Sequence, residues 1–165
     1  MPERKLSAIL RGLCENCIDF IVVGGVAAVL HGAPIQTYDL DVVYSRAPEN
    51  IDRLLKFLGD VDAIFRTQPD RRLRPKASHL EGSGHLNLLT RFGPLDLLAH
   101  IGSDLTYNES LPRAVEMDVG EGLRVRVLDL ETIIAIKEGL ASEKDLAALP
   151  ILRRTLRELN KDRDA

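Results

Sequence analysis

Apolar positions recur at three- and four-residue spacing near the start of the chain: Leu6, Ile9, Leu10 and Leu13. This spacing predicts an amphipathic helix. The apolar run at residues 19–23 predicts a buried strand that leads directly into Gly24 and Gly25. Residues 26–32 predict a short helix ending at Gly32, because glycine commonly follows the last helical turn.

Residues 37–44 alternate with the two-residue period of a strand. One face carries Asp39, Asp41 and Val43, and the other carries Tyr38, Leu40, Val42 and Tyr44. The predicted strand therefore holds two carboxylates on one face. Pro48 suits the first turn of a following helix, whose inner side carries Ile51, Leu54, Leu55 and Leu58.

The hydrophobic pattern fades over residues 59–84, where basic side chains collect instead: Arg66, Arg71, Arg72, Arg74 and Lys76. Such a run is typically a solvated face, although a nucleic-acid acceptor could use it. Two strands are predicted at residues 85–91 and 95–99. A hairpin is predicted at residues 115–127, with its turn at residues 120–122.

The last part of the chain predicts helices in separate pieces. Asp129 can cap a helix through Leu140, and Ser142 with Asp145 resembles a capping box. Pro150 suits the first turn of a final helix. We therefore expect an α/β chain that forms one domain, residues 1–165, with a core at about residues 19–127 and a helical C-terminal part at residues 129–160.

Composition narrows the function classes. The chain has 165 residues, 45% of them hydrophobic and 28% charged, which is typical of one compact globular domain. A net charge of −3 argues against a histone-like coat on nucleic acid, and the absence of tryptophan leaves little material for a base-stacking platform. The apolar run at residues 20–30 is too short to cross a bilayer, and the start of the chain does not resemble a secretory signal. With only two cysteines there is no disulfide framework, so we expect a cytoplasmic protein that does not bind a membrane.

The candidate chemistry lies between residues 23 and 43. A glycine pair at a strand-to-helix turn lets a phosphate approach the backbone, and the helix start adds unpaired N–H groups. Asp39 and Asp41 can jointly hold a divalent cation, because Mg²⁺ prefers a few carboxylates plus phosphate oxygens. A third carboxylate would complete a two-metal site, and Asp96 is the candidate because aliphatic residues flank it in a predicted strand.

These segments together resemble the nucleotidyltransferase superfamily, which includes DNA polymerase beta, and within it the small branch of abortive-infection type toxin enzymes. Gly24, Gly25, Thr37, Asp39 and Asp41 match the first family motif in GGVAAVLHGAPIQTYDLDVV. The three later motifs are matched in order by Asp96 in PLDLLA, by Lys137 in LETIIAIK, and by Lys144 and Asp145 in SEKDLAAL. The resemblance spans roughly residues 20–160 and implies an α+β fold with a mixed central sheet flanked by helices.

The resemblance also implies an activity: Mg²⁺-dependent (or Mn²⁺-dependent) transfer of a nucleoside monophosphate from an NTP to an acceptor hydroxyl, with release of pyrophosphate. The implied metal ligands are Asp39, Asp41 and Asp96, and Lys137 would offset charge on the departing pyrophosphate. The implied nucleotide-binding residues are Gly24, Gly25, Thr37, Lys144 and Asp145. The acceptor stays open between tRNA, a protein and a small molecule.

Three positions depart from the family pattern. Ile35 and Ser142 stand where arginine is usual, and Ala148 stands where a second aspartate is usual. These departures support the main alternative, a non-catalytic nucleotide-binding or antitoxin-like module of the same fold. A Rossmann-type dinucleotide binder fits less well, because a glycine pair replaces the G-x-G-x-x-G pattern.

Plain structural alternatives also remain for single residues. Asp96 could be a partly solvated acid near a turn, and Lys137 could simply extend to the surface. Lys144 and Asp145 could be nothing more than the first turn of a helix.

Overall fold

A seven-stranded sheet forms the centre of the molecule in the computed structural model, which describes residues 5–165. The strand order is β3-β4-β5-β2-β1-β9-β8. The strands are β1 (Phe20–Val23), β2 (Leu40–Tyr44), β3 (Ile64–Phe65), β4 (Leu86–Thr90), β5 (Gly93–Leu98), β8 (Ala114–Asp118) and β9 (Arg124–Leu128). β2 runs parallel to β5 and β1 runs parallel to β9, whereas the other neighbours are antiparallel. The sheet is therefore mixed, as the resemblance implied.

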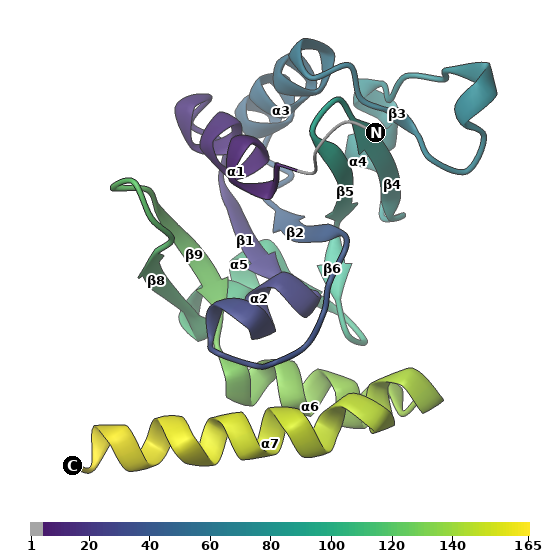
Figure 1. Ribbon diagram of the computed structural model, residues 1–165. Helices are drawn as coiled ribbons and strands as arrows, with labels where there is room; N and C mark the ends of the chain where they lie inside the picture. The colour runs from purple at the N-terminus through teal and green to yellow at the C-terminus, as the bar shows by residue number, and fades with distance from the viewer. Residues whose placement is uncertain (1–4) are drawn as a thin grey trace.

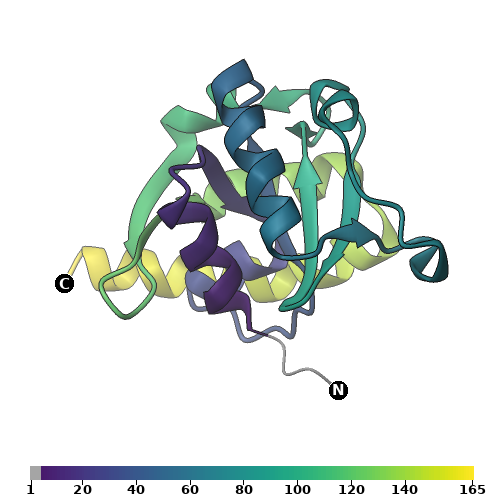
Figure 2. The same ribbon diagram turned by 90° about the horizontal axis from the view of Figure 1, so that it is seen from above.

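Helices lie on both sides of this sheet (Figure 1). The helices are α1 (Leu6–Glu15), α2 (Gly24–Leu30), α3 (Pro48–Asp60), α4 (Ala77–Glu81), α5 (Tyr107–Ser110), α6 (Leu130–Leu140) and α7 (Glu143–Arg163). In Figure 1, α1 and α3 lie above the sheet, and α6 and α7 lie side by side below it; Figure 2, seen from above, shows α1 and α3 in front of the strands. The protein is a mixed α/β structure.

The core continues through both faces of the central strands. Consecutive residues of β1 and β2, among them Ile21, Val22, Val42 and Val43, have no exposed surface. A strand with burial on both sides must be covered by helices on both sides, and the layers above and below the sheet provide this cover. This packing holds β1, β2 and β5 in a fixed register, and so fixes the positions of the residues at their ends.

Most of the elements expected from the hydrophobic pattern are present, with different ends. Asp129 caps α6 by accepting from the Thr132 backbone N–H at 2.8 Å, and Ser142 caps α7 by accepting from the Asp145 N–H at 3.1 Å. The strand predicted at residues 37–44 begins only at Leu40, so Asp39 lies just before β2. The fading pattern at residues 59–84 covers β3, a 3₁₀ turn at Pro69–Arg71 and α4.

The expectation for Pro150 is wrong. Pro150 lies inside α7, which continues without interruption from Glu143 to Arg163. Proline removes one helical hydrogen bond, but its neighbours Leu149 and Leu152 are buried against the core. This packing holds the two halves of α7 in one helix.

Four short elements between residues 100 and 113 were not predicted from the sequence: β6 (His100–Ile101), β7 (Leu105–Thr106), α5 and the 3₁₀ turn Leu111–Arg113. β6 and β7 form a separate two-stranded sheet. Each is too short to show a period. Across residues 5–165, no helix combines the length and apolar character that crossing a membrane requires.

Candidate functional site

The glycine pair forms the first two residues of α2, directly after β1, and the acidic segment packs against this glycine turn. Gly24 has a φ of +66°, and a Cβ added there would lie 2.3 Å from Asp41 Oδ2. A Cβ on Gly25 would lie 2.6 Å from Thr37 Oγ1. Both glycines are therefore required by the close approach of the segment that carries the carboxylates.

Asp41 and Asp96 are partners across the parallel pair β2 and β5. Their carboxyl groups lie within hydrogen-bonding reach of each other, and the side chain of Asp96 is only 13% exposed. Burial, followed by the neighbouring Asp96 carboxyl, raises the pKa of Asp41 from 3.8 to about 7, and Arg66 opposes this rise. Asp39 is more open, with 43% of its side chain exposed. Two of the three predicted carboxylates thus lie side by side on neighbouring strands, and Asp39 lies just before β2.

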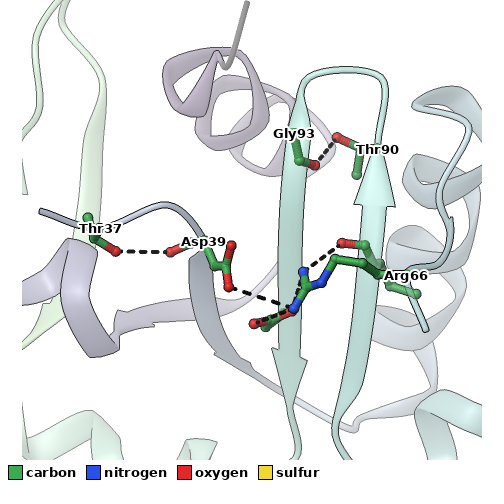
Figure 3. Close-up of polar contacts among 7 residues, drawn as sticks. Thr37, Asp39, Arg66, Thr90 and Gly93 are labelled. Carbon is green, nitrogen blue, oxygen red and sulfur yellow. Dashed lines mark hydrogen bonds and ion pairs between the residues drawn. The ribbon is translucent and has the colours of Figure 1, made fainter. Parts of the chain in front are cut away.

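Arg66 directly follows β3, and its side chain reaches across β4 and β5 to these carboxylates (Figure 3). Its Nη1 lies 3.0 Å from Asp96 Oδ1, and its Nη2 lies 3.3 Å from Asp96 Oδ2 and 3.7 Å from Asp39 Oδ2. Nη1 also donates to the carbonyl oxygen of Leu88 at 3.2 Å. A guanidinium therefore partly neutralises the acidic cluster.

The side chains, as they lie, do not form a closed metal site. Across residues 5–165, no group of three or more histidine, cysteine, aspartate or glutamate side chains could hold a metal ion. Two observations nevertheless favour a divalent cation. Asp41 and Asp96 lie opposite each other on neighbouring strands, and the buried Asp96 Oδ1 has no hydrogen-bond donor within the described residues. Its contact with Arg66 is electrostatic. Carboxylate oxygens are the donors that a divalent cation prefers, so Asp39, Asp41 and Asp96 suit one chemically, but Arg66 occupies oxygens of Asp39 and Asp96 in this structure.

A pocket of about 240 Å³ opens beside Asp41, the one of the three predicted carboxylates that lines it, and has both polar and apolar lining. Its polar lining comes from Asp41, His85, His100, Lys137 and Asp145, and Gly24 contributes backbone. The apolar lining includes Leu98 and Ile101 next to the sheet and Ile133, Ile136 and Leu140 from α6. The pocket therefore joins the glycine turn and the acidic cluster to the C-terminal helices.

Lys137 and Asp145 belong to this pocket, whereas Lys144 does not line it and is exposed. Lys137 Nζ lies 3.3 Å from Asp145 Oδ1. The Ser142 hydroxyl, and secondarily Lys137, lowers the pKa of Asp145. Asp145 thus acts as the partner of Lys137 and also stands in the first turn of α7.

The three departures from the family pattern have local explanations in the fold. Ile35 and Ala148 pack as partly buried side chains against the core, and Ser142 is the N-cap of α7. Sequence reasoning placed Arg66 only within a basic run and did not identify it as a site residue. His85 and His100 were also missed; their ring centroids lie 5.4 Å apart at the pocket. No periodic signal marks Arg66 or His100, because β3 and β6 have only two residues each; His85 lies at the start of a predicted strand, whose pattern does not show that its ring meets His100.

Comparison with known proteins gives fold-level likenesses. No protein-family profile matches the chain, and no curated protein matches it. The crystal structure of a proposed nucleotidyltransferase from Thermotoga maritima is similar with a TM-score of 0.57 and 15% sequence identity, over 93% of this chain and 91% of that one. An antigenic nucleotidyltransferase-like protein from Paracoccidioides brasiliensis is similar with a TM-score of 0.49 and 18% identity, over 96% of this chain and 87% of that one. The Thermotoga likeness shows that the chain has the nucleotidyltransferase fold, and it does not bear on the toxin branch.

Proposed function

We propose that the protein is a Mg²⁺-dependent nucleotidyltransferase that moves a nucleoside monophosphate from an NTP to an acceptor hydroxyl and releases pyrophosphate. The observation that carries this proposal is the pairing of Asp41 with Asp96 across β2 and β5, together with the packing of Asp41 on Gly24. Three carboxylates grouped beside a glycine pair match the chemistry of nucleotidyl transfer. The fold, which the Thermotoga protein shares, is consistent with it.

Asp39, Asp41 and Asp96 are the residues that would hold Mg²⁺, or Mn²⁺ in its place. When bound, the cation would offset the charge of the triphosphate and favour deprotonation of the acceptor hydroxyl. Asp96 is the least exposed of the ion-paired carboxylates and lies on the β4 side of the cluster. In this proposal Asp96 would orient the acceptor, whereas Asp41, which packs on Gly24, would hold the cation on the side of the nucleotide.

The remaining residues would bind the nucleotide. The backbone N–H groups at Gly24 and Gly25 would bind phosphate oxygens. Thr37 packs on Gly25 and donates its hydroxyl to the Asp39 carbonyl at 3.5 Å, which would support this segment. Lys137 supplies a positive charge at the pocket for the leaving pyrophosphate. The apolar lining that α6 gives the pocket would pack against the nucleoside.

Incubation with each α-labelled NTP, Mg²⁺ and cell extract tests the activity and identifies the acceptor at once. We expect one extract component to become labelled, and we expect EDTA to abolish the labelling. Asp41→Asn serves as the matched inactive protein, because the substitution keeps the side-chain shape and removes the charge. Labelling that persists in EDTA would contradict the proposal.

A non-catalytic nucleotide-binding module is the second candidate. One observation favours it: Arg66 pairs with Asp39 and Asp96, so the carboxylates already have a cationic partner. The same incubation separates the two candidates. A protein that binds nucleotide but labels nothing, with every NTP and extract, would be such a module.

A further inference from the structure

Arg66 contacts two of the three carboxylates at once. Within residues 5–165, it is the one cationic side chain that forms ion pairs with Asp39 and Asp96, at 3.7 and 3.0 Å. The side chain is 31% exposed, and apart from these carboxylates it bonds only the Leu88 carbonyl at 3.2 Å. It is therefore held chiefly by charge, on a long side chain that can turn into solvent.

A divalent cation and this guanidinium would compete for the same oxygen atoms. Arg66 already engages both oxygens of Asp96 and one oxygen of Asp39. Two cations that share carboxylate oxygens a few ångströms apart repel each other strongly when the site is partly shielded from water. Occupancy by one therefore excludes occupancy by the other.

We propose that Arg66 is a resident counter-ion: it neutralises the carboxylates in the cation-free protein and must leave before a divalent cation binds. The inference rests on the proposed function in that the three carboxylates take such a cation. It goes beyond that function because it makes Arg66 the residue that sets the cation concentration at which the site fills. Removal of the guanidinium then tightens cation binding.

A purely supporting role for Arg66 gives the opposite result. If the guanidinium held Asp39 and Asp96 in the positions that a cation needs, then its loss would loosen the ligands and weaken cation binding. The sign of the change in affinity therefore separates the two roles. Activity is not needed for this measurement.

The test is Mn²⁺ binding without nucleotide, followed by the paramagnetic signal of free Mn²⁺ and by calorimetry. Arg66→Gln removes the charge and keeps a donor for the Leu88 carbonyl; Arg66→Ala removes both. The matched control is Arg74→Ala, because Arg74 pairs with Asp62 at 3.3 Å and makes no contact with the site carboxylates. Should Arg66→Ala not fold in EDTA, Arg66→Gln carries the test.

We expect Arg66→Gln to bind Mn²⁺ about tenfold more tightly than the wild type, the scale of one charge pair, and Arg74→Ala to bind as the wild type does. The Mn²⁺-induced rise in Tm should also be larger in Arg66→Gln. Unchanged or weaker Mn²⁺ binding in Arg66→Gln overturns the counter-ion role while leaving the proposed function in place. If no protein binds Mn²⁺, with or without an NTP, the proposed function and the counter-ion role both fall.

Discussion

Asp41→Asn is expected to stabilise the protein when divalent cations are absent, by an amount that increases with pH. Burial, and then the adjacent Asp96 carboxyl, raises the pKa of Asp41 from 3.8 to about 7. The folded protein therefore holds a proton on Asp41 more tightly than the unfolded chain does. By linkage, ionisation of Asp41 has no effect on stability below about pH 4 and reduces stability progressively as the pH rises through 7.

The raised pKa sets the size of the effect. The difference between 3.8 and about 7 is about three pH units, and at 1.36 kcal/mol per unit this bounds the effect at about 4 kcal/mol. Because Arg66 opposes the rise and solvent reaches part of the cluster, we expect about 2 kcal/mol at pH 8. For a chain of this length that corresponds to about 4–8 °C in Tm. Asparagine keeps the shape of the side chain, and its amide can donate to Asp96.

Thermal and urea unfolding in EDTA, at intervals between pH 4 and 8, measure this difference. Asp39→Asn is the matched control, because Asp39 has a side chain that is 43% exposed. We expect its free energy of unfolding to stay within about 0.5 kcal/mol of the wild-type value. An Asp41→Asn protein that is no more stable than the wild type at pH 8, or whose gain is the same at pH 4, would refute the reasoning.

Three further outcomes are expected. Gly24→Ala should cost about 2 kcal/mol more in urea unfolding than Gly122→Ala: both positions have positive φ (+66° and +72°), but only at Gly24 would a Cβ meet Asp41, at 2.3 Å. Ser142→Ala should lower the free energy of unfolding by about 1 kcal/mol at pH 7 through loss of the α7 cap. Because the Ser142 hydroxyl lowers the pKa of Asp145, this deficit should shrink as the pH falls through that lowered pKa, which thermal unfolding in acid will show. Calorimetry should find NTP binding weak in EDTA and tight with Mg²⁺, since the carboxylates repel a triphosphate; equal affinities would contradict the cation-bridged site.

Much of the fold could be predicted because long elements carry a clear period. The spacing of apolar residues gave α1 and α3, and the two capping residues Asp129 and Ser142 correctly marked the starts of α6 and α7. Pro150 was expected to lie in the first turn of a final helix, but it lies inside α7. Tertiary burial of its neighbours overrides this local signal, and such packing is invisible to a local pattern.

The candidate site shows the same division between local and long-range information. Gly24, Asp41 and Asp96 were predicted together, and the strand register brings them together. Arg66, which directly follows the short β3, lies near the carboxylates because β3 pairs with β4, β4 pairs with β5, and β5 pairs with β2. A contact that depends on three strand pairings leaves no trace in the spacing of nearby residues.

The most direct test of the central claim compares nucleotide binding with nucleotidyl transfer in Asp96→Asn. Asp96 lies beside Asp41 but on the neighbouring strand, so its loss should leave Asp39, Asp41 and the glycine turn able to bind Mg²⁺-NTP. We expect measurable NTP binding by calorimetry and a fall in kcat for label transfer on the order of 100-fold or more, because Asp96 would orient the acceptor and help remove its proton. Full transfer activity in a folded Asp96→Asn protein would contradict the account.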